Sequence, residues 1–285
     1  MFGRRGGKQR SAPKWSRQKM LALLIGAGLT VVLFVVGVAL AVVYTVQPAR
    51  HTAEQNITET GTSRSGSGGA GGSGQPAAAD PRDALADKPM MSVDEDASHP
   101  GPVSTADPGT PITLPAATGT GPAQVPSGFP RTPEGAMAQL AAIDQTALQS
   151  GTLQGAREVI SAWAMPGGPT PTTWSGVRAL AQFFDAAGLS GGGTHQLAIA
   201  VTPLMGQIKG SVGADFTVPC IDFEIDVTLQ QTSRGAAADC QRMQWNGTRW
   251  MVGPGAEPAT PPSVWPDTDT AIAVGYRDLR QETPR

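Results

Sequence analysis

The residues with the clearest chemistry are Cys220 and Cys240, the two cysteines of the chain. Thiols pair in oxidising compartments, and strand alternation places both on the same polar face of a sheet. A short turn near residues 232–235 would nevertheless set Cys220 opposite residue 247 or 248, too far from Cys240 for a bond. A bend at Pro219, a bulge or a longer loop would restore the pair. An intramolecular disulfide and two free or intermolecular thiols are therefore both open.

Three acids, Asp222, Glu224 and Asp226, have a regular spacing. They could act as a general acid and base or hold a cation. Their strict alternation with apolar residues is more typical of the solvated face of a half-buried strand, which is the interpretation that we favour. The histidines are scattered (His51, His99 and His195), and the cysteines form no CxxC pair. We therefore predict no catalytic residue, no cofactor and no metal site.

Aromatic and glycine patterns also favour structural roles. Gly66, Gly68 and Gly71 match GxGxxG, but no strand precedes them and no helix follows, so a dinucleotide site is rejected. The larger aromatic set is expected in the core rather than in a ligand box, although a pocket between helices and sheet stays open. This set is Trp163, Trp174, Trp245, Trp250 and Trp265.

The elements that position these residues begin after Gly128. Thr132-Pro133-Glu134 has the features of a helix start: an N-cap, a proline at the first position and an acid in the first turn. Apolar residues at helical spacing predict a helix from there to about 150, a second over 153–164 and a third over 172–187.

Alternation of apolar and polar residues then predicts strands. They cover residues 197–202, 220–231, 239–245 and 248–252, with a hairpin turn at Asn246-Gly247, and a short helix follows at about 270–279. The order predicts an α+β domain over residues 128–285. Three N-terminal helices would pack on one face of a curved antiparallel sheet of about four strands.

Composition separates this domain from the rest of the chain. The 285 residues include 36 Gly and 25 Pro, a high share of backbone breakers. Residues 47–127 contain no aromatic residue and no apolar periodicity. Such a segment cannot bury enough surface to offset its ordering entropy, so we expect a disordered tether.

The segment from Leu21 to Val46 has 26 residues and no charge, long enough for a helix that crosses a bilayer. We assign a transmembrane helix to residues 20–46. A cleaved signal peptide, with Ala39-Leu40-Ala41 as its cleavage site, is the alternative, but its apolar region would be shorter. The basic residues of the tail 1–19 place the N-terminus in the cytoplasm and the C-terminal domain outside the cell membrane. They are Arg4, Arg5, Lys8, Arg10, Lys14, Arg17 and Lys19.

The charge distribution also limits the partners. The net charge is −2, and the positive charge is concentrated in the tail, so nucleic-acid binding by the outer domain is not expected. The tail is expected to contact anionic lipid of the bilayer, and contact with a cytoplasmic partner or nucleic acid is the less favoured alternative. Gly37 and Ala41 form a small-xxx-small pair, which makes a second copy of the chain a further candidate partner.

The helix-first order, the opening TPEGAMAQL and the hairpin CQRMQWNGTRWMVGPG resemble actinobacterial single-pass membrane proteins associated with mobile-element transfer genes. Their outer domain is similar to the cystatin-like, nuclear-transport-factor-two-like fold of bitopic scaffold subunits of type IV secretion and conjugation machines. The resemblance covers residues 128 to about 280, and no catalytic signature of the family aligns. It implies a non-enzymatic, membrane-anchored scaffold or interaction subunit whose partners are other envelope or transfer-apparatus proteins.

A second hypothesis belongs to another class. The outer part could be a membrane-tethered ligand-binding or enzymatic domain with a cavity between helices and sheet. An envelope-stress sensor is a weaker third alternative, because a tail of 19 residues leaves little room for a signalling domain.

Overall fold

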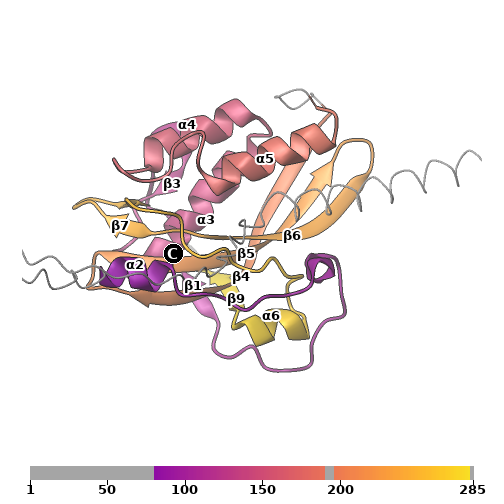
Figure 1. Cartoon of the computed structure of the whole chain (residues 1–285), viewed down its shortest axis with the longest axis horizontal. Coiled ribbons are helices and arrows are strands. Elements are labelled where there is room, and N and C mark those ends of the chain that lie inside the picture. Colours follow the sequence, from indigo (N-terminus) through magenta and orange to yellow (C-terminus); the bar gives the residue numbers. More distant parts are fainter. Residues whose placement is uncertain (1–79, 190–195, 283–285) are drawn as a thin grey trace, which may run out of the picture. The chain divides into compact units, whose positions relative to one another are not determined.

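The computed structural model describes residues 80–189 and 196–282, which are built around a curled sheet (Figure 1). The strands follow the order β1-β9-β4-β5-β7-β8, and β6 pairs with β5 beside that path. Their bounds are β1 Ile112–Leu114, β4 Ala198–Ser211, β5 Phe216–Thr228, β6 Thr232–Cys240, β7 Met243–Trp245, β8 Trp250–Val252 and β9 Arg277–Gln281. A separate small hairpin joins β2 (Gly119–Thr120) to β3 (Pro126–Ser127).

Three helices cover one face of the sheet: α3 (Pro133–Gln149), α4 (Leu153–Trp163) and α5 (Ser175–Ala186). Thr132 caps α3 by accepting a hydrogen bond from the Gly135 amide at 3.1 Å, which satisfies one of the unpaired amides of the first turn. The predicted helices are confirmed, although α5 begins three residues later than expected. Most side chains of α3 are buried, because this helix packs on the sheet and on its neighbouring helices.

Strand β5 has two buried faces. Ile221 and Phe223 belong to the core beneath the helices, whereas Cys220 belongs to a second cluster on the opposite face with Val264 and Tyr276. Successive residues of a strand point to opposite faces, so β5 contributes to both layers.

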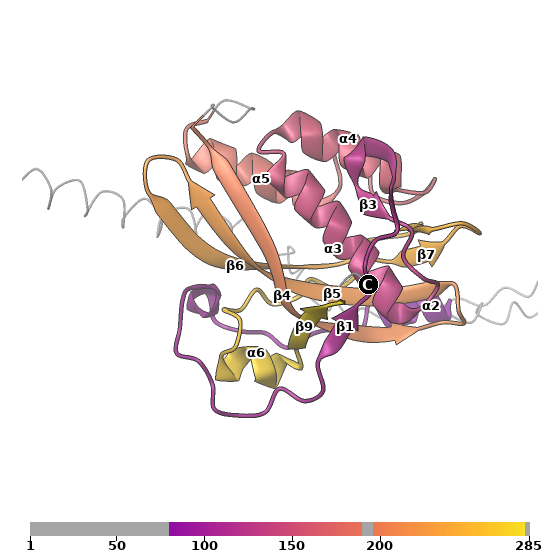
Figure 2. The ribbon, with the colours of Figure 1, turned by 180° about the vertical axis from the view of Figure 1, so that it is seen from behind.

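The second layer is built from the two ends of the described chain. It contains α2 (Pro81–Ala86), the 3-10 turn η1 (Glu95–Ser98) and α6 (Asp269–Val274), which lie across the sheet from α3–α5 (Figure 2). The side chain of Arg242 is 7 % exposed and holds α2 through an ion pair with Asp83, at 2.7 Å. Lys209 extends the attachment by donating to the carbonyl oxygen of Ala86 at 2.9 Å.

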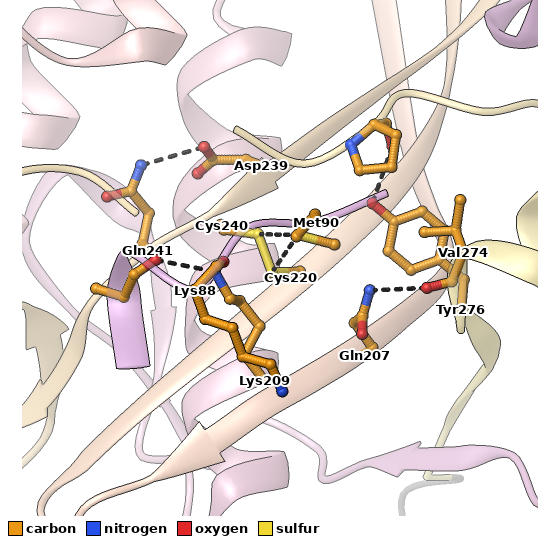
Figure 3. Close-up of a disulfide and its surroundings, with 12 residues drawn as sticks. Lys88, Met90, Gln207, Lys209, Cys220, Asp239, Cys240, Gln241, Val274 and Tyr276 are labelled. Carbon is orange, nitrogen blue, oxygen red and sulfur yellow. Dashed lines mark hydrogen bonds between the residues drawn. A yellow bond between two sulfur atoms is a disulfide. The ribbon is translucent and has the colours of Figure 1, made fainter. Parts of the chain in front are cut away.

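Cys220 and Cys240 form a disulfide within this second layer (Figure 3). The β5–β6 ladder runs from Thr228 opposite Thr232 to Cys220 opposite Cys240, with a Cα–Cα distance of 4.1 Å. The sulfur of Met90 lies 3.8 and 3.6 Å from the two cysteine sulfurs. The predicted register difficulty was wrong, because the chain turns at residues 229–231 rather than at 232–235.

The predicted fold class is wrong in its arrangement. The structure is α+β, but its sheet has seven strands rather than about four, and β1 pairs with β9 in parallel. Helix α6 follows most of the sheet, so the helices do not all come first. The cystatin-like plan of three helices on one face of an otherwise open antiparallel sheet is therefore replaced by a sheet with two covered faces.

The tether assigned to residues 47–127 is also corrected. From residue 80 onward this segment contributes α2, β1 and buried side chains such as Ile112 and Leu114. The apolar residues of segment 80–127 pack singly against the sheet and α3. No apolar periodicity within the segment therefore predicts their burial. Its order comes from long-range contacts, of which the pairing of β1 with β9 is the clearest.

Among the helices of residues 80–189 and 196–282, none has the length and apolar character needed to cross a bilayer. The predicted span at 20–46, the basic tail at 1–19, residues 47–79 of the tether, His51 and His195 lie outside the described residues.

The later strands differ from expectation in length. Strand β4 continues through Pro203 with a register shift before Met205, and the predicted strand 239–245 is divided between β6 and β7. The hairpin at Asn246 closes through a bond from its amide to the Arg249 carbonyl, so its loop has four residues. Strand β9 occupies the end of the helix predicted at 270–279.

Candidate functional site

A cavity of about 250 Å3 lies between α3, α5 and strands β4, β5 and β6. This volume is just below the roughly 300–1,000 Å3 of common small-molecule sites. In Figure 2, α5 runs beside one end of β4. Both elements contribute residues to the lining of the cavity. Apolar residues make most of its wall: Leu148, Ala179, Leu180, Phe183, Ile199, Phe223, Ile225, Val227, Ala237 and Ala238.

Strand alternation explains this wall. Phe223, Ile225 and Val227 occupy alternate positions of β5, and Ile199 of β4 pairs directly with Val227. Asp239 of β6 pairs with Ile221, six residues before Val227 on β5. At about 3.4 Å per residue, the wall therefore extends roughly 20 Å along the sheet from its acidic end.

Asp144 of α3 is the first acid of that end. It is 2 % exposed, lines the cavity, and its Oδ2 atom has no hydrogen-bond partner among the described residues. Burial raises the pKa of this carboxyl well above its usual range, and the charges of Asp239 and Glu257 raise it further. Burial therefore favours the protonated, neutral form of Asp144 when the cavity holds no cation.

Asp239 is the second acid. Its Oδ1 atom accepts hydrogen bonds from Nε2 of Gln241 at 3.1 Å and from Oγ of Ser175 at 3.4 Å. Its Oδ2 atom is buried and has no partner in the described part of the chain, although the residue as a whole keeps some exposure. Burial raises the pKa of Asp239 to about 7, so small changes in its surroundings change its charge near neutral pH.

Glu257, in the segment after β8, supports this acidic end. Its Oε1 atom accepts from the amide of Ser175 at 2.9 Å, from the Ser175 hydroxyl at 2.7 Å and from Gln241 at 3.1 Å. Arg178 of α5 pairs with its other oxygen at 3.3 Å. Glu257 thus fixes the start of α5 and the position of Gln241, and through them the carboxyl of Asp239.

Trp174, at the N-cap of α5, completes the polar end. Its side chain is buried and lines the cavity, but its Nε1 donor has no partner in the structure as described. The indole ring packs so closely on Gly176 that a Cβ atom there would lie 2.9 Å from two ring carbons. The buried Trp163 and Trp250, in contrast, donate to the carbonyls of Pro122 and Pro130 at 3.1 and 2.8 Å.

The chemistry of the cavity is thus an apolar body with unpartnered polar atoms at one end. Polar groups buried without a partner cost free energy, and native structures keep few of them. A ligand that donates hydrogen bonds to the two carboxyls would remove that cost. Within residues 80–189 and 196–282, no group of three or more His, Cys, Asp or Glu is placed to hold a metal ion.

The acids that the sequence singled out lie on the other face of the sheet. Glu224 and Asp226 both pair with Arg234. Asp222 is fully buried under the C-terminal segment and accepts from the Val264 amide at 3.3 Å, so the solvated interpretation was wrong for this residue. Burial raises the pKa of Asp222 to about 8.

Sequence reasoning missed Asp144 and Asp239. A signal for Asp144 existed, because it is four residues from Leu140 and adjacent to Ile143 on the stripe of α3 that packs inward. No comparable signal marked Asp239, because its face depends on the register of β6. The tryptophans Trp163, Trp174 and Trp250 are core residues as predicted, whereas Trp245 and Trp265 are only partly buried.

Comparison of the chain with protein-family models, with curated proteins and with solved structures finds no match. The function must therefore be inferred from the chemistry of the cavity and from the layout of the chain.

Proposed function

We propose that the described domain binds a small, largely apolar molecule in the cavity between α3, α5 and the β4–β5–β6 part of the sheet. The observation that carries this proposal is a pair of carboxyl oxygens at the end of an apolar cavity, Oδ2 of Asp144 and Oδ2 of Asp239, that have no partner among the described residues. Buried polar groups are normally satisfied, and a bound ligand would satisfy these.

The structure around the cavity supports binding by a preformed site. The acidic end is held by Ser175, Gln241 and Glu257 through hydrogen bonds of 2.7–3.1 Å. The opposite face of the same strands is locked by the disulfide and the second layer. A preformed site loses less ordering entropy on binding than a flexible one, so even a small cavity can give useful affinity.

The order of segments along the chain supports a position of the domain outside the cell membrane. The uncharged segment at 21–46 and the preceding basic residues support a single-pass anchor with an N-terminus in the cytoplasm. The domain would then present its cavity outside the cell membrane. A disulfide suits that compartment, because thiols stay reduced in the cytosol.

The test is a thermal-shift and calorimetric screen of the full-length chain with small amphiphiles that vary in head group and apolar body. Ala237→Phe places a large side chain on the cavity wall, and Ala236→Phe places the same side chain on the opposite face of β6. We expect stabilisation by one chemical class, lost in Ala237→Phe and kept in Ala236→Phe. Equal shifts in both variants, or no shift with any class, would contradict the proposal.

An assembly role in a transfer apparatus is compatible with ligand binding and stays a separate prediction. It rests on the anchor-and-tether layout of the sequence rather than on a surface of the described domain. Purification of the native membrane complex after cross-linking in intact cells tests it directly. Recovery of the isolated chain, with no envelope protein attached, would contradict it.

A further inference from the structure

We propose that the ligand of this cavity carries a single cationic amine, which sits at the acidic end and contacts the carboxyls of Asp144 and Asp239. This inference rests on the binding function proposed above and names the chemical class of the ligand. It follows from the hydrogen-bonding capacity of that end, from its charge and from the shape of the apolar wall.

Hydrogen-bonding capacity is the first argument. Two carboxyl oxygens, Oδ2 of Asp144 and Oδ2 of Asp239, accept no hydrogen bond from residues 80–189 and 196–282. A protonated amine brings three N–H donors and no acceptor, so it has enough donors for both oxygens. The remaining unpartnered atom, Nε1 of Trp174, is a donor, and an acceptor oxygen elsewhere on the same ligand would satisfy it.

Charge is the second argument. Asp144, Asp239 and Glu257 influence one another electrostatically, and β4 and β5 contribute only apolar side chains to the cavity wall. The nearby cation, Arg178, is engaged by Glu257. In the empty cavity, burial and mutual repulsion therefore raise the pKa of both Asp144 and Asp239, which favours their protonated forms. A cationic ligand would lower the pKa of both carboxyls, because a nearby opposite charge favours the ionised form.

The shape of the wall is the third argument. The apolar surface continues away from the acids along β5 through Phe223, Ile225 and Val227. Leu180 and Phe183 of α5 also line it. A molecule with its charge at one end and a short hydrocarbon body at the other matches this division. A compact hydrated cation would leave the apolar part empty, and an anion would meet the two acids that line the cavity, Asp144 and Asp239.

The pH dependence of binding distinguishes an amine from a neutral ligand. An alkylamine stays protonated from pH 5.5 to 8, whereas Asp239, with a pKa of about 7, loses its proton in this range. Amine binding should therefore strengthen as the pH rises. A neutral alcohol that accepts from the protonated acids should weaken instead. Tyr276, on the other face of the sheet, keeps its proton throughout because burial raises its pKa.

The experiment measures the affinity of the full-length chain for n-hexylamine and for 1-hexanol by calorimetry at pH 5.5, 6.5 and 8. We expect the amine to bind at least tenfold more tightly than the alcohol at pH 8, with an advantage that shrinks at pH 5.5. Asp239→Asn and Asp144→Asn should each weaken amine binding about tenfold and leave alcohol binding within about twofold. Asp226→Asn, on the opposite face, should change neither.

The outcomes separate the two proposals. If 1-hexanol binds as tightly as n-hexylamine, or if amine affinity falls as the pH rises, the amine assignment is wrong and the binding function stands. If neither probe binds and Ala237→Phe changes no ligand response in the wider screen, both proposals fail. The wild-type pH profile needs no variant, so the amine assignment can be rejected even where a substitution disturbs folding.

Discussion

Asp222 shows what a single buried carboxyl does to the molecule. Its pKa is about 8 in the folded chain, against about 3.9 in an unfolded one. Between these values the folded state keeps a proton that the unfolded state releases. The stability associated with the neutral acid is therefore fully present below pH 4 and is lost as the pH rises to 8.

Asp222→Asn keeps the shape of the side chain and cannot ionise. We expect this variant to be more stable than the wild type at pH 8 by about 1–3 kcal/mol and to differ little near pH 4. Urea unfolding at a series of pH values measures the effect. Asp226→Asn is the matched control, because Asp226 lies on the same face of β5 but is partly exposed beside Arg234. A variant that parallels the wild type at every pH would show that Asp222 is already charged in the folded chain.

For single residues, the sequence predicts which face of a strand a side chain occupies better than it predicts whether that face is buried. The alternation of Asp222, Glu224 and Asp226 correctly separates one face of β5 from the other. It does not reveal that Val264 and Tyr276, from the C-terminal segment, pack on this face and bury Asp222. Burial of a strand's polar face depends on a distant segment, and local periodicity carries no information about it.

Among the elements, the pairing of β5 with β6 decides both the disulfide and the acidic end of the cavity. Cys240 and Asp239 are neighbours in β6 and point to opposite faces, so one register places the first beside Cys220 and the second on the cavity wall. A shift of the β5–β6 register by one residue would move Cys240 away from Cys220 and Asp239 away from the cavity wall. The disulfide fixes this register covalently.

We expect the double variant Cys220→Ala, Cys240→Ala to be less stable than the oxidised wild type by about 3 kcal/mol, because the bond closes a loop between residues 20 apart in sequence. Chemical denaturation with and without dithiothreitol provides the measurement. The reductant should lower the stability of the wild type and leave the double variant unchanged. Equal stability of the oxidised wild type and the variant would mean that the noncovalent second layer alone holds the register.

Elements with strong local signals were predictable. Thr132 and Pro133 mark the start of α3, and the stripes of α4 and α5 follow helical spacing. Strand β1 was not predictable, because its three residues lie in a proline-rich segment and become a strand only through β9. The separation of β6 from β7 was also hidden, since both satisfy the same alternation.

The whole domain depends on the segment before Gly128. Ile112, Leu114 and Val125 are buried, and at about 1.5–3 kcal/mol each they represent roughly 5–9 kcal/mol of hydrophobic stabilisation. That amount is comparable to the total stability of an ordinary domain. We therefore expect a fragment of residues 80–282 to unfold cooperatively and a fragment of residues 128–282 to lack a stable fold.

Circular dichroism during thermal unfolding, together with binding of a hydrophobic dye, compares the two fragments. The shorter one should bind the dye at room temperature, because it lacks Ile112, Leu114 and Val125 of the core and the part of the second layer that α2 supplies. A cooperative transition in the shorter fragment, at the same temperature as in the longer one, would show that the first segment is only an addition to an independent core.

The parallel pair of β1 and β9 gives the chain a fixed order of completion. Ile112 of β1 pairs with Leu279 of β9, and most of the described sequence lies between them. The two strands can therefore pair only after Leu279 has been synthesised. At a synthesis rate of about 5–20 residues per second, the wait is roughly 10–30 s. Strand β1, the first of the sheet, can therefore pair only after β9, the last described strand, has been synthesised. The sheet of this domain therefore cannot be completed while the chain is being synthesised up to β9, and until then the core side chains beside β1 stay accessible to solvent.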